Sequence, residues 1–409
     1  MGSTSPKRSP AAPLPSASSP SLILTQPTAA ERSRIWTLTH PMWGPALTLD
    51  GYLSREAYLT TVPLAKEGGV THWILTDGSQ PPDARPLLSS CETLRKRALS
   101  ACAPTSTPAD VTVVDGIAHG LGSVFTDEQY RGRGYASRMM QELGTRLRTW
   151  QVATTNHNAP YSPSPSPPHA LFSVLYSDIG KTFYARSGWA PFASSHVEFA
   201  PAPTEPPAQN ESSVAKPIGY HELAELCSVD AQLLRATLAR RAVTHPGTAC
   251  VALLPDLDAM LWHLMREDFM TTHIFGRTPA VKGAVAGAVG RRVWAVWTRG
   301  YYGGLDKVEG NTLHILRVVV EDEDMAVEGE LAHGFSEIIR IAQAEAAAWR
   351  SADVQMWNPT DKVSALVEAC GIAHRVVVRD QSSIASLMWY GEGETAELDW
   401  VANEKYGWC

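Results

Sequence analysis

Tyr130-Arg131-Gly132-Arg133-Gly134-Tyr135-Ala136 joins a strand pattern to a helix pattern. Upstream, residues 116–126 alternate as a strand does. Downstream, an apolar face recurs at helical spacing through Ala136, Met139, Met140, Leu143, Leu147 and Trp150. A glycine-rich turn that opens a helix directs free backbone N–H groups and the positive end of the helix dipole at one point. Such a point suits a pyrophosphate, and the two arginines add positive charge to it.

Two other phosphate-binding loops fit this stretch less well. A dinucleotide-binding loop needs Gly-x-Gly-x-x-Gly, but Gly132 and Gly134 are followed by Ser137 in place of the third glycine. A Walker loop needs a Lys-Ser or Lys-Thr pair, which this stretch does not have. A solvated turn rich in arginine and glycine remains the alternative, and the flanking strand and helix patterns count against it.

A second segment has a strand pattern followed by a helix pattern. Residues 171–175 are apolar, as expected of a short buried strand. Ser177 or Asp178 can then cap a helix that runs to about Arg186, and Gly188 ends that helix.

Both segments resemble signature elements of the GNAT superfamily of N-acyltransferases. Arg131, Gly134 and Ala136 stand in the Arg-x-x-Gly-x-Ala pattern of its acyl-CoA-binding loop. Phe183-Tyr184, with the glycine and tryptophan at 188 and 189, is similar to its Phe-Tyr-x-x-x-Gly-Phe element. The resemblance implies an α/β fold with a mixed sheet and acetyl-CoA as cosubstrate. The cofactor-binding residues that it implies are Val124, Phe125, Thr126, Arg131, Gly132, Arg133, Gly134, Tyr135, Ala136 and Ser137.

Acetyl transfer to an amine needs a base, an oxyanion donor and an acid. The solution pKa of a lysine side chain is near 10.4, so a proton must leave before the nitrogen can attack. His119 is the candidate base. The alternative is a structural role, which is the commoner one for a lone histidine. A backbone N–H near Val124 or Phe125 can stabilise the oxyanion. In the GNAT superfamily the tyrosine at the position of Tyr184 protonates the leaving thiolate; a core-facing aromatic is the alternative for this residue.

Longer stretches resemble the fungal lysine acetyltransferases of lysine catabolism. They are residues 131–140, residues 172–180 with Phe183-Tyr184-Ala185, and residues 403–409. This resemblance implies transfer of acetyl to the side-chain amine of free L-lysine, in lysine degradation. Two alternatives stay open. One is a different amine, such as a polyamine, an aminoglycoside or a protein lysine; the other is an acyl-CoA-binding protein without catalysis.

Composition argues against several classes of protein. The formal net charge is −7, which disfavours a nucleic-acid-binding protein and suits a cationic small-molecule substrate. No apolar run reaches the roughly eighteen residues that cross a membrane. The six cysteines show no paired spacing and the 13 histidines form no metal-binding pair, so we predict neither disulfides nor a metal. We expect a reducing, cytoplasmic location, and the oligomeric state stays open.

Proline-rich stretches divide the chain. Residues 1–20 read as a disordered tail rich in serine and proline, with a transit peptide as a weak alternative. Residues 21–200 form the predicted GNAT-like acetyl-CoA-binding catalytic domain, which contains a solvent loop at 156–169. A linker at 201–215 leads to a substrate-shaping domain over residues 216–409.

The C-terminal half echoes the element order of the first. Strand patterns over Arg292–Trp297 and Thr312–Val320 precede a helical stripe from Leu331 to Trp349, and further strands and a helix follow. We therefore predict a second, degenerate GNAT-like unit that shapes the amino-acid pocket. It should not bind CoA, because Glu321–Asp324 puts four carboxylates where the pyrophosphate loop would lie. A solvated turn is the alternative for this acidic run.

Overall fold

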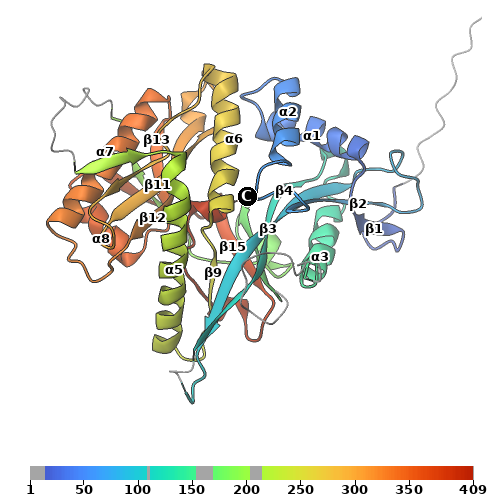
Figure 1. Ribbon diagram of the computed structural model, residues 1–409. Coiled ribbons are helices and arrows are strands. Elements are labelled where there is room, and N and C mark those ends of the chain that lie inside the picture. Colours follow the sequence, from blue (N-terminus) through green and yellow to red (C-terminus); the bar gives the residue numbers. More distant parts are fainter. Residues whose placement is uncertain (1–13, 108–110, 153–168, 203–213, 409) are drawn as a thin grey trace, which may run out of the picture.

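Two mixed β-sheets with helices around them make up the molecule in the computed structural model, which describes residues 14–107, 111–152, 169–202 and 214–408 (Figure 1). The strands of the first sheet are β1 (Leu22–Thr25), β2 (Val70–Asp77), β3 (Ser89–Cys102), β4 (Thr112–Phe125), β5 (His169–Ser177), β15 (Ile384–Trp389) and β6 (Ala190–Pro191), in this spatial order. The sheet is extended from β3 by β9 (Cys250–Leu253) and β16 (Asp399–Trp400).

The second sheet contains β14 (His374–Val378), β7 (Ser195–Phe199), β13 (Asp353–Trp357), β12 (Asn311–Val320), β11 (Val293–Tyr301), β10 (Gly283–Ala286) and β8 (Ala215–Ile218), in this spatial order. The α-helices are α1 (Ala29–Trp43), α2 (Leu49–Leu59), α3 (Tyr135–Leu147), α4 (Thr182–Ala185), α5 (Tyr220–Thr244), α6 (Leu257–Phe275), α7 (Glu330–Ala348) and α8 (Asp361–Ala369). Short 3-10 turns are η1 (Glu128–Tyr130), η2 (Val308–Gly310), η3 (Thr395–Glu397) and η4 (Lys405–Gly407).

Each sheet contains a parallel pair of strands joined by a helix. In the first sheet β4 pairs in parallel with β5 and α3 connects them, while in the second sheet β12 pairs in parallel with β13 and α7 connects them. Parallel strands need such a crossover because a short turn can only reverse the chain. The two halves of the molecule are therefore built on the same supersecondary unit.

The two halves also exchange strands. Strand β7 precedes residue 201 in the sequence but lies in the second sheet, between β14 and β13. Strand β15 comes late in the sequence but lies in the first sheet, where it pairs with β5 and β6. Residues 203–213 of the predicted linker lie outside the described residues, and the predicted domain boundaries stay a prediction.

The three largest apolar cores hold this arrangement together. Helix α3 buries Met139, Met140 and Leu143 against the first sheet, and α7 buries Phe335 and Ile338 against the second. The third core lies between the sheets and combines side chains of both, among them Phe172, Leu387, Trp294, Leu316 and Tyr406. Because burial of apolar surface is the main favourable term in folding, this shared core fixes the two sheets relative to each other.

Most predicted elements are confirmed, with two corrections. The helix predicted from Ser177 or Asp178 to Arg186 is wrong in its extent: β5 continues through Ser177, and α4 begins only at Thr182, after a turn in which Gly180 has a φ of 78°. The disordered tail predicted for residues 1–20 is wrong for residues 14–20, which pack on α3. Tyr135 Oη donates to the Pro15 carbonyl at 2.6 Å. Residues 1–13 lie outside the described residues, as do residues 156–168 of the predicted solvent loop.

Candidate active site

A cavity of about 830 Å³ lies where the first sheet opens. Its walls come from α1, α2, β2, β3, β4, α3, β5, α4, α6 and the last described residue, Trp408. Figure 1 places the C-terminal end of the chain between α6 and the first sheet. Lys96 on β3 holds that end there, since its Nζ donates to the carbonyl of Gly407 at 2.8 Å.

The divergence of β4 from β5 forms one wall. Their parallel pairing ends at the pair Leu121 and Leu175, beyond which residues 122–126 of the β4 end line the cavity. The register between β3 and β4 also shifts here, and Ser123 has a φ of 54°. A β-bulge of this kind bends the strand and re-aims its backbone groups. The backbone of Val124 and Phe125 therefore borders the cavity and not a neighbouring strand on the β5 side.

The predicted phosphate loop borders the same cavity. Gly134, with a φ of 82°, is the N-cap of α3, and no side chain caps that helix end. Gly132 has a φ of 74°, and a Cβ added to it would meet nothing within 4 Å. The loop is therefore open, and the free N–H groups at the start of α3 suit the diphosphate of CoA. Arg131 and Ala136 line the cavity.

Other predicted loop residues are placed differently. Arg133 is exposed, Ser137 is half-buried, and neither lines the cavity. The Tyr135 side chain is buried in the core beneath α3, away from the cavity, and its hydroxyl binds the N-terminal segment. Ala17 of that segment lies 3.2 Å from where a Cβ on Gly134 would be. The segment thus packs against the outer side of the phosphate loop.

Tyr184 lines the cavity from α4 and is largely buried. Its ring packs edge-on against Phe183 at a centroid distance of 5.0 Å. Burial raises the pKa of its phenol above the ordinary value near 10, which keeps the hydroxyl protonated at neutral pH. A protonated hydroxyl on this wall can serve as a proton donor.

Glu92 on β3 is a carboxylate that the sequence analysis missed. Its Oε1 accepts a hydrogen bond from Ser123 Oγ at 2.8 Å, and its Oε2 lies 3.5 Å from His72 Nε2. Burial raises the pKa of Glu92 above its ordinary value and lowers the pKa of His72 to about 4. His72 is therefore neutral at pH 7, and Glu92 is a stronger base than an exposed glutamate.

A second acidic group and two arginines complete the polar lining. Glu56 pairs with Arg55 at 2.6 Å, and burial raises the pKa of Glu56. Arg266 projects from α6 between two rings, with its guanidinium carbon 5.7 Å from the centre of Tyr302 and 5.6 Å from that of Trp408. The walls around these charges are aromatic and aliphatic. Such a cavity suits a small charged molecule with an apolar stem.

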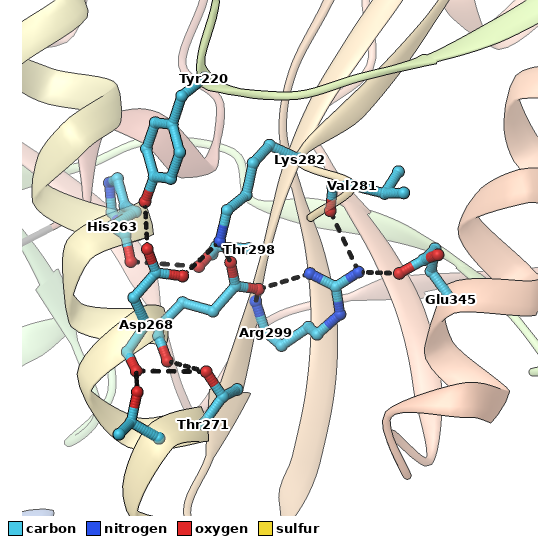
Figure 2. A network of polar contacts seen from close by, with 11 residues as sticks. Tyr220, His263, Asp268, Thr271, Val281, Lys282, Thr298, Arg299 and Glu345 are labelled. Carbon is cyan, nitrogen blue, oxygen red and sulfur yellow. Dashed lines mark hydrogen bonds and ion pairs between the residues drawn. The ribbon is translucent and has the colours of Figure 1, made fainter. Parts of the chain in front are cut away.

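The position of α6 is fixed by a buried network next to Arg266 (Figure 2). Glu267 and Asp268 both accept hydrogen bonds from Lys282 Nζ at 2.6 Å. Glu267 also accepts from Arg299 at 2.6 Å. Since Lys282, Arg299 and Glu267 are almost completely buried, this network anchors one side of α6 to the second sheet and leaves Arg266 directed at the cavity.

His119 lies outside the cavity, although it shares β4 with the cavity-lining residues. Its side chain is fully buried, and its Nε2 lies 3.3 Å from Gln151 Oε1. Burial lowers its pKa to about 4. The His119 imidazole therefore does not line the cavity, and its role as the base stays a prediction.

The acidic run of the second half is not merely a solvated turn. Glu321 is buried, and its carboxylate accepts from Arg292 Nε at 2.6 Å and from the Gly290 N–H at 2.7 Å. Glu323 is exposed and pairs with Arg240. In the described parts of the chain, no three His, Cys, Asp or Glu side chains are grouped as metal ligands, and no helix has the length and apolarity to span a membrane.

Comparison with known proteins relates the chain to N-acyltransferases. Residues 196–409 match the family model described as LYC1 GNAT-like C-terminal domain, which confirms the GNAT-like second unit. A lysine acetyltransferase of Yarrowia lipolytica is 24% identical over 294 residues, 65% of this chain and 69% of that protein. A GCN5-related N-acetyltransferase from Kribbella flavida is a similar solved structure (TM-score 0.47, 12% identity, 90% of this chain, 70% of the other). So is a probable N-acyltransferase from Enterococcus faecalis (TM-score 0.46, 10% identity, 90% and 72%).

Proposed function

The chain belongs to the LYC1 GNAT-like family, and we propose that it moves the acetyl group of acetyl-CoA to the side-chain amine of free L-lysine. The observation that carries this proposal is the placement of Glu92 beside Ser123, where β4 leaves β5, in a cavity that Tyr184 also lines. A base and an acid then border the same space as the open phosphate loop.

The phosphate loop gives the cosubstrate its place. The N–H groups at the start of α3 and the Arg131 guanidinium face the diphosphate of CoA, and the pantetheine runs along the free edge of residues 122–126. The thioester then lies beside the bulge at Ser123. A backbone N–H of Val124 or Phe125 can donate to the oxygen that becomes negative as the amine attacks.

Glu92 is the general base of this proposal and replaces His119. Its carboxylate attracts the lysine ammonium and accepts a proton, and the neutral amine attacks the thioester carbon. Burial raises the pKa of Glu92, so the difference between the pKa of the carboxyl group and that of the amine is smaller than for an exposed glutamate. His72 and the Ser123 hydroxyl hold the carboxylate in place. Collapse of the tetrahedral intermediate expels the CoA thiolate, which takes the proton of the Tyr184 hydroxyl.

The relative from Yarrowia lipolytica supports lysine as the acceptor, as do the two half-buried carboxylates of the cavity, Glu56 and Glu92, which suit a cationic amine. Thiol release from acetyl-CoA is the test, with lysine, ornithine, spermidine and a lysine-containing peptide as acceptors. Lysine should give the highest kcat/KM. Ornithine is one methylene shorter and should lose about 10- to 200-fold. Faster turnover of the peptide or of spermidine would point to another amine, and CoA binding without any thiol release would indicate a non-catalytic protein.

A further inference from the structure

Arg379 has a buried guanidinium group without a hydrogen-bond partner. The residue directly follows β14, is 7% exposed, and its backbone N–H donates to the Ser194 carbonyl at 2.8 Å. Among the described residues, none accepts a hydrogen bond from its Nε, Nη1 or Nη2. A buried charge without a partner is costly and is seldom kept unless something binds it.

Aromatic and basic side chains surround this guanidinium. Its central carbon lies 3.7 Å from the ring centre of Trp357, and Lys405 Nζ lies 4.0 Å from the same ring centre. His196 is the register partner of Trp357, and His314 packs edge-on against the Trp357 ring at 6.1 Å. In both histidines Nδ1 is buried and has no partner among the described residues.

One aromatic ring, that of Tyr176, lies between this cluster and the candidate active-site cavity. Val197, Ile315 and Met356 belong to the core that contains α7, so the alternate residues His196, His314 and Trp357 are on the other face of the second sheet. That face meets β5, where the Tyr176 ring lies 5.7 Å from Trp357. Tyr176 also lines the 830 Å³ cavity and thus connects the two.

The charge of the cluster is positive. Burial lowers the pKa of Arg379 to about 10, which leaves it a cation at pH 7, and burial lowers the pKa of His196 and of His314, which leaves both neutral. No ion pair joins Arg379 to a carboxylate within the described residues. His196 Nε2 lies 3.6 Å from Glu198 Oε2, so its N–H is directed at that carboxylate. The cluster therefore offers an incoming anion one unbalanced guanidinium, and the neutral His314 ring can add an N–H at Nδ1.

We propose that Arg379, stacked on Trp357, binds a carboxylate group at this interface between the sheets. The stacked face of the guanidinium is covered by the indole, which leaves the in-plane N–H groups as its donors. Two parallel N–H groups match the two oxygens of a flat carboxylate. A single negative charge balances a single guanidinium in these aromatic surroundings.

Two sources can supply this carboxylate. One is the α-carboxylate of the acceptor amino acid, a source that rests on the proposed function. The other is a free carboxylic acid that binds whether or not the chain is a lysine acetyltransferase. Cadaverine, which is lysine without its carboxylate, and acetate separate these sources.

The test compares Arg379→Met with Arg375→Met in the full chain. Arg375 is on β14 too, but its side chain is 69% exposed and pairs with Glu198, so its variant controls for the loss of an arginine on this strand. If the acceptor supplies the group, Arg379→Met should raise the KM for lysine about 30-fold or more and leave the kinetics with cadaverine unchanged. If a free acid supplies it, acetate should raise the Tm of the wild type and of Arg375→Met but not of Arg379→Met.

Methionine is apolar and close in length to arginine, so Arg379→Met should fold. Arg379→Lys, which keeps the charge without the planar fork, should fall between the wild type and Arg379→Met in whichever readout changes. Equal lysine kinetics and an equal acetate response in Arg379→Met and Arg375→Met would overturn the proposal. Failure of the proposed function would show separately, as a wild type that turns over no lysine while its acetate response still reports on Arg379.

Discussion

Ser123 Oγ donates to Glu92 Oε1 across 2.8 Å, and this bond joins the bulge of β4 to the half-buried carboxylate of β3. Ser123 has a φ of 54°, a conformation that few residues other than glycine adopt. The backbone that we propose to border the thioester and the carboxylate that we propose as the base are thus held in one unit. Loss of either partner should disturb both.

Glu92→Gln should retain the fold and lose about 10²- to 10⁴-fold in kcat, because the amide keeps the shape of the side chain and cannot accept a proton at pH 7. Steady-state thiol release gives this number. Glu368→Gln, at an exposed position on α8, is the matched control and should behave as the wild type. A Glu92→Gln enzyme with wild-type kcat would move the base to another residue.

The pH dependence should follow Glu92. Its pKa is raised in the folded protein, so the carboxylate form appears only above the ordinary pH range of a glutamate, and kcat/KM should rise with pH as Glu92 ionises.

The stability of the fold should depend on the same group. The folded state binds the proton of Glu92 more tightly than the unfolded chain does, so ionisation of Glu92 lowers stability as pH rises through its folded pKa. Glu92→Gln should therefore be at least as stable as the wild type at pH 7 in thermal unfolding, and its acidic limb should be lost. His72, with a pKa of about 4, should add no limb near neutrality.

Tyr184→Phe removes the proposed acid and should lower kcat by about 10²-fold with little change in Tm. Tyr390→Phe is the control for the loss of a buried hydroxyl, because the Tyr390 hydroxyl bonds Ser173 Oγ at 2.6 Å and does not line the cavity. Tyr390→Phe should lower the Tm and leave kcat unchanged. Wild-type turnover in Tyr184→Phe would leave the residue a packing role.

Gly134→Val should raise the KM for acetyl-CoA strongly, since its Cβ would lie 3.2 Å from the Ala17 Cβ and displace the turn that presents the N–H groups at the start of α3. Valine at positive φ is strained, so the variant should also lose about 1–3 kcal/mol of unfolding free energy. Gly393→Val has the same strain, with a φ of 86°, at a site away from the cavity. Calorimetry of CoA binding separates the two: unchanged CoA affinity in Gly134→Val would contradict the loop assignment.

Lys282→Met should destabilise the fold by about 3–5 kcal/mol, because it leaves Glu267 and Asp268 without the cation that bridges them. Chemical denaturation measures this loss. Lys216→Met, at an exposed position on β8, is the control. We expect the KM for the acceptor to rise as well, since Glu267 and Asp268 fix the part of α6 that carries Arg266.

The first half of the site could be predicted from local signals. Strand β4, the glycines at the start of α3 and the tyrosine of α4 follow one another along the sequence, and their spacing and periodicity indicated their elements. The extent of α4 could not be predicted, because Ser177 is a good helix cap but pairs with Ile384 of β15, a strand more than two hundred residues away. Long-range pairing overrode the local preference there.

The second half of the site needed the tertiary structure. Glu92 is one of several charged and polar residues on β3, so the strand pattern did not single it out, and only the hydrogen bond from the bulge at Ser123 shows what it faces. Arg266 and Trp408 join the cavity from α6 and from the end of the chain, and no periodicity brings them together. His119 is on the right strand, but its side chain is buried beside Gln151 and does not line the cavity.

The exchange of β7 and β15 between the sheets bears on how the protein is made. Strand β15 pairs with β5 along one wall of the catalytic sheet, yet it leaves the ribosome more than two hundred residues later. A nascent chain in which α3 and α4 have formed therefore still exposes an unpaired edge of β5. Strand β7 is likewise unpaired until β13 has been synthesised. Catalytic competence should appear only when Trp408, which lines the cavity, has been synthesised. Until then the unpaired strand edges are where nascent chains would associate wrongly or bind a chaperone.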